Sequence, residues 1–251
     1  MKATVVTRSI RIVSALAALP VVAALAAFAA GTLAAQGDTR PTIAVVAFSN
    51  GALGAAHAEL DPLSAGMQDL LIYSLSGNQK IRVVERANLQ TLINEQNLGA
   101  SGRVDAATAA HLGKILGAGH MIMGGFVTDT QGAMRIVARS VNVETSLVEY
   151  STSVDGKQAD LMLLIAKLSD QINSGLKLPA LASGTKEAAI DQAKKVPFQA
   201  TMLYSRALAA KDAGNKDEAV QLLQKSLAAF PEFGPAQQEL KKLQPPPSGT
   251  E

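Results

Sequence analysis

The chain offers few side chains that could perform chemistry. It has three histidines and no cysteine, which excludes disulfides, thiolate nucleophiles and cysteine metal sites. His57, Glu59 and Asp61 alternate along the chain and could offer nitrogen and oxygen ligands to a metal ion. They stand in a Gly/Ala-rich stretch, residues 50–58 and just beyond, without a partner motif elsewhere. We therefore expect a solvated loop there and no metal site.

The other two histidines and one charged pair have structural interpretations. His111 falls within a predicted helix and is expected on its surface, while His120 begins a predicted strand and is expected to be partly buried and hydrogen-bonded. Glu85-Arg86 stands where a strand meets a helix and is interpreted as a structural ion pair.

Glycine-rich positions and serines give no catalytic motif. The glycines between residues 113 and 125 do not follow the strand–GxGxxG–helix order or the GxxxxGK[ST] order of phosphate loops. Helix ends and close packing account for them better. No GxSxG motif is present. The sequence therefore predicts a protein that is not an enzyme and that carries no cofactor.

The first 35 residues are typical of a secretory signal. Lys2, Arg8 and Arg11 precede an apolar run from Ile12 to Ala30, and small residues before Gln36 offer a cleavage site after Ala35. An uncut helix kept as a membrane anchor is the alternative, since about 20 apolar residues can span a bilayer. Residues 1–35 hold three of the 23 basic residues and no acid, so the remainder carries 20 basic and 21 acidic residues. This balance gives no reason to expect nucleic acid as a partner.

Hydrophobic patterns predict the elements of an α/β domain over residues 42–178. The run Thr42–Phe48 is continuous and β-branched, as in a strand covered on both faces. We predict further strands at 80–84, 120–128, 134–144 and 147–154, and helices at 63–75, 85–96, 106–116 and 159–176. Asp105 and Gly117 are the expected caps of the helix at 106–116. The order indicates a mixed sheet with packed helices, whose last three strands form tight hairpins.

A small all-α module is predicted at residues 198–243. A linker at 179–197 would precede it, and a disordered, proline-rich tail at 244–251 would follow it. Lysines in the linker could touch anionic lipid weakly, which would give a peripheral membrane association. The expected helices cover 198–213, 216–230 and 235–243.

The first two of these helices have the spacing of a tetratricopeptide repeat. Ala207, Gly214, Ala219 and Pro231 occupy its small, turn and terminating positions, whereas Ala210 and Ser226 depart from it. An ordinary helical hairpin is the alternative. Since such repeats present a groove that binds peptides, we predict partner contacts at three positions that we expect on the exposed side of the first helix. These are Tyr204, Leu208 and Lys211.

The α/β domain resembles a known family. Val83-Val84-Glu85-Arg86, the Glu95-Gln96 pair, Gly99 to Gly102, Asp105 to Thr108 and Leu112-Gly113 are similar to the family of the curli secretion lipoprotein CsgG. The stretch Val141–Tyr150 is similar to a later strand–turn–strand of the family. The resemblance spans residues 42–176. It implies an α/β fold also found in TolB N-terminal domains and in activators of peptidoglycan synthases, and a periplasmic or outer-membrane location.

Two departures separate the chain from the curli pore. The tight connections between residues 120 and 154 leave no room for hairpins that cross a membrane, because each strand of such a hairpin needs about 9–11 residues. Gln36 stands where a lipid-accepting cysteine is usual. We therefore expect a non-enzymatic periplasmic scaffold that binds envelope proteins or peptides in surface-structure assembly and secretion. An oligomeric ring of a secretion channel and a regulator of a peptidoglycan synthase are the alternatives.

Overall fold

A computed structural model describes residues 38–95 and 105–244. The chain divides into two compact units, Met1–Thr39 and Arg40–Glu251, and every element below belongs to the second. The expected signal with its cleavage site at Ala35 and Gln36, the turn at 99–102 and most of the expected tail lie outside the described residues.

The centre of the fold is a mixed sheet, as predicted, and it has six strands where five were expected. Its order is β3-β1-β4-β5-β6, with β2 also paired to β4. The pairs β1–β3, β1–β4 and β2–β4 are parallel, and β4–β5–β6 is an antiparallel meander. The strands are β1 (Thr42–Val45), β2 (Ser49–Asn50), β3 (Arg82–Val83), β4 (His120–Thr128), β5 (Ala133–Asn142) and β6 (Val148–Lys157).

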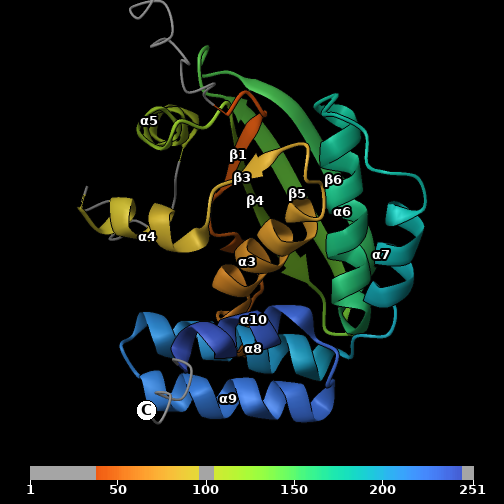
Figure 1. Ribbon diagram of the computed structural model, residues 1–251. Coiled ribbons are helices and arrows are strands. Elements are labelled where there is room, and N and C mark those ends of the chain that lie inside the picture. Colours follow the sequence, from red (N-terminus) through yellow and green to blue (C-terminus); the bar gives the residue numbers. More distant parts are fainter. Residues whose placement is uncertain (1–37, 96–104, 245–251) are drawn as a thin grey trace, which may run out of the picture. The chain divides into compact units, whose positions relative to one another are not determined.

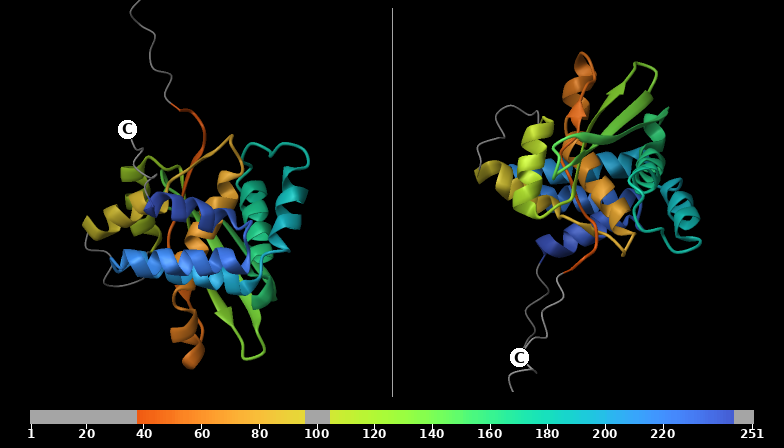
Figure 2. Two further views of the ribbon diagram at one scale, coloured as in Figure 1. Left: turned by 60° about the horizontal axis from the view of Figure 1, so that its bottom comes forward. Right: turned by 90° about the horizontal axis from the view of Figure 1, so that it is seen from above.

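Helices cover both faces of the sheet, which explains why β1 is buried along its whole length. Ile43 and Val45 point into the larger core, with α3 (Leu63–Ser76) and α6 (Leu161–Gly175). Ala44 and Val46 point into a second core, with α4 (Arg86–Glu95) and α5 (Ala106–Leu116). Figure 1 and both views of Figure 2 place α6 on the opposite side of the sheet from α4 and α5.

The ends of α5 confirm the predicted caps. The Asp105 carboxylate accepts a hydrogen bond from the Thr108 backbone N–H at 2.7 Å, and Gly117 adopts a left-handed conformation with φ of 63°. A left-handed residue at this position suits glycine because it has no Cβ. Within α5, a side chain at Gly113 would collide with Val143 and Met121, so this glycine lets the helix lie close to the sheet.

The meander is closed by short connections. Asp129 accepts hydrogen bonds from the backbone N–H groups of Gln131 and Ala133, which fixes the first turn around Gly132, where φ is 80°. Asn142 does the same for Glu144 and Thr145 in the second turn. Neither connection holds an inserted segment.

Three helices form the C-terminal module, α8 (Phe198–Asp212), α9 (Lys216–Ala229) and α10 (Gly234–Leu243). They lie together at one end of the sheet (Figure 1). Helix α8 packs directly on α3, where a Cβ on Gly66 would come within 2.6 Å of the Ser205 Cβ. Buried residues of the module therefore join the same hydrophobic core as α3 and α6.

Two segments differ from the expectations. The stretch expected as a linker contains helix α7 (Thr185–Ala193), which lies beside α6 and buries Ala193. This helix contains one large apolar residue, Ile190, so its sequence has no apolar periodicity that predicts a helix. The stretch expected as a loop contains the short helix α2 (Ala55–Leu60), which buries Leu60.

Candidate partner-binding cleft

An ion pair joins the α/β domain to the helical module. Arg86, the first residue of α4, is 6% exposed, and its two Nη atoms donate to both carboxylate oxygens of Asp212 at the end of α8, one of them at 3.0 Å. A bidentate guanidinium–carboxylate pair has a fixed geometry, so it fixes α8 relative to α4. The sequence-based interpretation paired Arg86 with its neighbour Glu85, and this is wrong. The true partner lies 126 residues away, where local sequence gives no signal.

A second polar contact lies at the same junction. The Tyr204 hydroxyl on α8 donates to a carboxylate oxygen of Asp69 on α3. The Tyr204 ring meets Phe233 edge-on at 5.6 Å between ring centroids, an arrangement that aromatic pairs favour. Tyr204 is 1% exposed, so its hydroxyl needs a partner, and Asp69 supplies one.

A third pair closes the module on itself. Lys211 of α8 donates to Glu239 of α10, and Lys242 lies 3.7 Å from the other oxygen of the same carboxylate. The Glu239 side chain is only 7% exposed, so two ammonium groups compensate a nearly buried charge.

These contacts line one cleft of about 720 Å³. We call it the junction cleft. It lies among α3, α7, α8 and α10, with the start of α4 at one side. Apolar and small side chains make much of its wall, among them Ile72, Tyr73, Ala188, Ala189, Val196 and Phe230. The hollow is large enough for several side chains of a partner.

The cleft brings together all three residues that we predicted as partner contacts. Tyr204, Leu208 and Lys211 line it side by side along α8. The expectation that they stand on an exposed face is wrong for Tyr204 and Leu208, which are each 1% exposed. Helix α8 is not half of an isolated hairpin, because α3 packs against this side of it. Asp69 and the wall of α7 were not predicted as parts of a site, and Arg86 was predicted only as the partner of Glu85.

Burial sets the ionisation of the polar groups in the cleft. The pKa of Asp69 is raised above its ordinary value because burial removes water from the carboxylate, and Glu239 adds to this, although the Tyr204 hydrogen bond and the charges of Arg86 and Lys242 oppose the shift. Burial and the neighbouring Asp69 also hold the pKa of Tyr204 well above its usual range. Tyr204 is thus a permanent donor at neutral pH.

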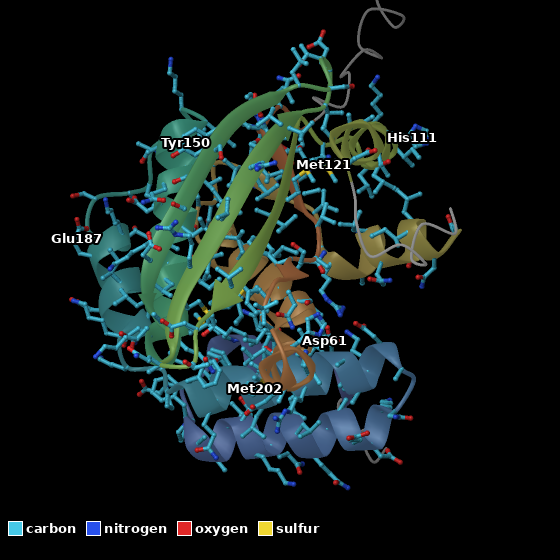
Figure 3. The ribbon with its side chains drawn as sticks, turned by 180° about the vertical axis from the view of Figure 1, so that it is seen from behind. Asp61, His111, Met121, Tyr150, Glu187 and Met202 are labelled. Atoms are coloured by element: carbon cyan, nitrogen blue, oxygen red, sulfur yellow. The ribbon has the colours of Figure 1, made fainter. Side chains whose placement is uncertain are left out.

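A separate polar cluster holds His120. Its Nδ1 lies 2.6 Å from Oε1 of Glu149, which also accepts from the Ser140 hydroxyl at 2.8 Å. His120 is partly buried and hydrogen-bonded, as predicted. In a hydrolytic triad the serine hydroxyl contacts the imidazole. Among the described residues, the Ser140 hydroxyl is hydrogen-bonded to the Glu149 carboxylate and not to the His120 imidazole, so this group is not arranged as a triad. Figure 3 shows His111 projecting outward from α5, at the predicted helix surface.

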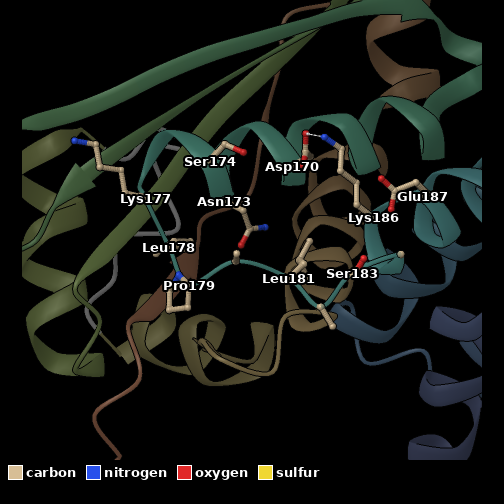
Figure 4. Close-up of a pocket in the computed structure, with 13 residues that line it drawn as sticks. Asp170, Asn173, Ser174, Lys177, Leu178, Pro179, Leu181, Ser183, Lys186 and Glu187 are labelled. Atoms are coloured by element: carbon tan, nitrogen blue, oxygen red, sulfur yellow. Dashed lines mark ion pairs between the residues drawn. The ribbon is translucent and has the colours of Figure 1, made fainter.

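A second hollow, of about 580 Å³, lies between α6 and the chain that leads into α7. Figure 4 shows its ion pair between Lys186 and Asp170, whose Nζ and Oδ2 atoms are 2.9 Å apart. Both side chains are partly exposed, and the pair ties the start of α7 to α6. Lys186 therefore has a structural partner in the segment that we expected to be a free, lysine-rich linker.

Within residues 38–95 and 105–244, no group of three or more histidine and acidic side chains could hold a metal ion. Over the same ranges, no helix combines the length and the apolar character needed to span a membrane.

Residues 24–135 match the family model of the curli production assembly/transport component CsgG. No curated protein matches the chain. The solved LpoB C-terminal domain from Escherichia coli is similar over 52% of this chain and 93% of its own, with 19% identity and a TM-score of 0.33. The lipoprotein GNA1162 from Neisseria meningitidis is similar over 54% of this chain and 98% of its own, with 16% identity and a TM-score of 0.36. The PelC dodecamer from Paraburkholderia phytofirmans is similar over 56% of this chain and 90% of its own, with 13% identity and a TM-score of 0.35.

Proposed function

We propose that this chain, whose residues 24–135 belong to the CsgG family, is a non-enzymatic periplasmic protein that binds other proteins in cell-envelope or surface-structure assembly and secretion. The observation that carries the proposal is the junction cleft of about 720 Å³, where a helical module is fastened to the family's sheet domain. Partly buried ion pairs hold its walls, so a partner would meet a preformed surface and lose less entropy on binding. The signal-like N-terminal sequence supports a location outside the cytoplasm.

Localisation is tested by fractionation with N-terminal sequencing. We expect the protein in the periplasmic or membrane fraction, with a new N-terminus at or near Gln36 if the signal is cut. Recovery from the cytosol with Met1 still present would contradict the proposal.

Partner binding is tested by photo-crosslinking in cells. A benzophenone amino acid at Ala189, an exposed residue of the cleft wall, is expected to form adducts with envelope proteins that mass spectrometry identifies. The same amino acid at Ala228, an exposed residue of α9 that is not among the lining residues, is the matched control. Equal amounts of adduct at both positions would contradict partner binding in the junction cleft.

The ring component of a secretion channel remains the second candidate, and one observation favours it. Strand β6 is ten residues long and stands at the edge of the sheet, where its outer backbone groups can pair with another chain. Light scattering of the purified protein decides between the two, since a ring requires a large closed assembly.

A further inference from the structure

The junction cleft combines an apolar wall with acids that lack ionic partners. Glu85 and Glu232 line it, are exposed, and have no ion-pair partner among the described residues. Asp69 lies deeper and has the Tyr204 hydroxyl as its hydrogen-bonding partner there. The cations of the cleft are already engaged, since Arg86 binds Asp212 and both lysines approach Glu239.

This arrangement leaves the lining short of positive charge. The five carboxylates of the cleft and its ion pairs face three cations: the acids are Asp69, Glu85, Asp212, Glu232 and Glu239, and the cations are Arg86, Lys211 and Lys242. A carboxylate in an apolar surrounding is stabilised strongly by a cation, because little water screens the interaction. Charge complementarity therefore favours an occupant with a positive charge.

A buried donor adds a second requirement. Arg86 is 6% exposed and lines the cleft, and its Nε–H has no acceptor among the described residues. A buried donor without an acceptor is unfavourable, so an acceptor oxygen that reaches this donor would be stabilising. A peptide offers both features at once, a carbonyl oxygen in its backbone and a cation in a side chain.

The wall explains the apolar part of the occupant. Helix α7 presents Ala188 and Ala189 to the cleft, and both are exposed. The same cleft is lined by the start of α10 and by Tyr73, whose hydroxyl lies 2.2 Å from the place where a Gly234 Cβ would stand. Small residues together with aromatic rings suit large apolar side chains of a partner.

We infer that the junction cleft binds an apolar peptide segment of a partner protein that carries a lysine or arginine, with its cation directed at Asp69, Glu85 and Glu232. The inference rests on the proposed function and specifies the partner's chemistry. It distinguishes the cleft from an anion-binding groove, because the cations that would hold an acidic peptide are already paired.

The test begins with an array of short synthetic peptides of one length, varied in charge and apolar content, probed with the purified protein. We expect the bound peptides to be enriched in lysine or arginine flanked by large apolar residues. Enrichment in acidic peptides, no charge preference, or no binding at all would overturn the inference.

The strongest binder is then labelled and measured by fluorescence anisotropy against variants. Asp69→Asn and Glu232→Gln are each expected to weaken binding about tenfold, the loss typical of one charge pair in a partly buried site. Glu144→Gln, in an exposed turn outside the cleft, is expected to leave the affinity unchanged. Equal affinity of all three variants with the wild type would overturn the inference.

A steric pair makes the result independent of charge. Ala189→Trp is expected to obstruct the cleft and weaken peptide binding strongly, while Ala228→Trp is not. Binding that survives Ala189→Trp would place the peptide elsewhere and overturn the inference. If envelope adducts form at position 189 in cells but basic peptides do not bind, the proposed function stands and only the stated chemistry fails.

Discussion

At the scale of single residues, Asp69 links pH to stability. Its pKa is raised above the ordinary value of 3.8 in the folded protein, mainly by burial. The folded state therefore holds its proton to higher pH than the unfolded state does, and stability falls as pH rises from the unfolded pKa through the folded one. The groups that face Asp69 are Tyr204, Arg86, Glu239 and Lys242.

We expect Asp69→Asn to remove this fall. The asparagine oxygen can still accept a hydrogen bond from Tyr204 but carries no charge to desolvate. The free energy of unfolding of the variant should therefore rise relative to that of the wild type as pH rises from about 4 towards 7. Urea unfolding at a series of pH values measures the difference. An Asp69→Asn variant that becomes less stable relative to the wild type as pH rises would contradict a raised pKa of Asp69.

Glu149 shows the opposite behaviour. Burial opposes its ionisation, but hydrogen bonds from His120, Ser140 and Asn142, with the charge of His120, outweigh burial and lower its pKa. An acid with a lowered pKa contributes stability that is present above the unfolded pKa and is lost as pH falls through the folded one. The cluster also holds the irregular register between β5 and β6 near Ser140.

We expect Glu149→Gln to lower the free energy of unfolding by about 1 kcal/mol at neutral pH, because it weakens hydrogen bonds to a charged acceptor. The loss should shrink in acid, where the wild-type carboxylate is itself protonated. Thermal unfolding of the variant and the wild type at neutral and at acidic pH measures this loss of stability. Glu144→Gln, in the exposed turn that follows β5, is the control and should change little.

At the scale of elements, the crossing of α3 and α8 depends on one small residue. A Cβ on Gly66 would stand 1.9 Å from Oγ and 2.6 Å from Cβ of Ser205, which is fully buried. The two helices would have to move apart, although alanine is the better helix former by about 1 kcal/mol.

We expect Gly66→Ala to destabilise the protein by about 1–3 kcal/mol, as overpacked cores usually do. Adding Ser205→Gly should recover part of the loss, and the double-mutant cycle measured by urea unfolding isolates the contact. Gly119→Ala, whose new Cβ would be 3.7 Å from its nearest neighbour, serves as the control. No recovery in the double variant would contradict direct contact at this crossing.

Elements differ in how well sequence periodicity predicts them. Strand β4 and helix α5 have the predicted bounds because apolar spacing and caps act over a few residues. Helix α7 is not predicted by periodicity because it contains a single large apolar residue, Ile190. The junction cleft was not predicted as a whole, since its polar contacts join residues 126 and 135 positions apart, and only long-range packing decides which face of α8 is buried.

At the scale of the whole molecule, the sheet domain and the helical module share one core. Buried residues of β1, α3, α6, α8, α9 and α10 form a continuous cluster. The predicted boundary at 179–197 therefore does not mark a break in packing, although it remains the point where the sequence changes character. Modules that share a core unfold together.

We expect a single cooperative unfolding transition, with far-UV circular dichroism and tyrosine fluorescence giving coincident curves. A chain that ends at residue 197 should lose several kcal/mol of stability, because it lacks α8, which packs on α3, and the buried side chains Tyr204, Leu208 and Phe233 of the shared core. Two separate transitions in the full chain, or a truncated chain of unchanged midpoint, would contradict a shared core.

The aromatic lining of the junction cleft has an optical consequence. The protein contains no tryptophan and three tyrosines, so its ultraviolet emission comes from Tyr73, Tyr150 and Tyr204. Two of these line the cleft, and one of them donates a hydrogen bond to a carboxylate. An occupant without aromatic residues that disturbs this bond would change the emission of the unlabelled protein. The cleft thus contains its own spectroscopic reporter, with Tyr150 as the constant background.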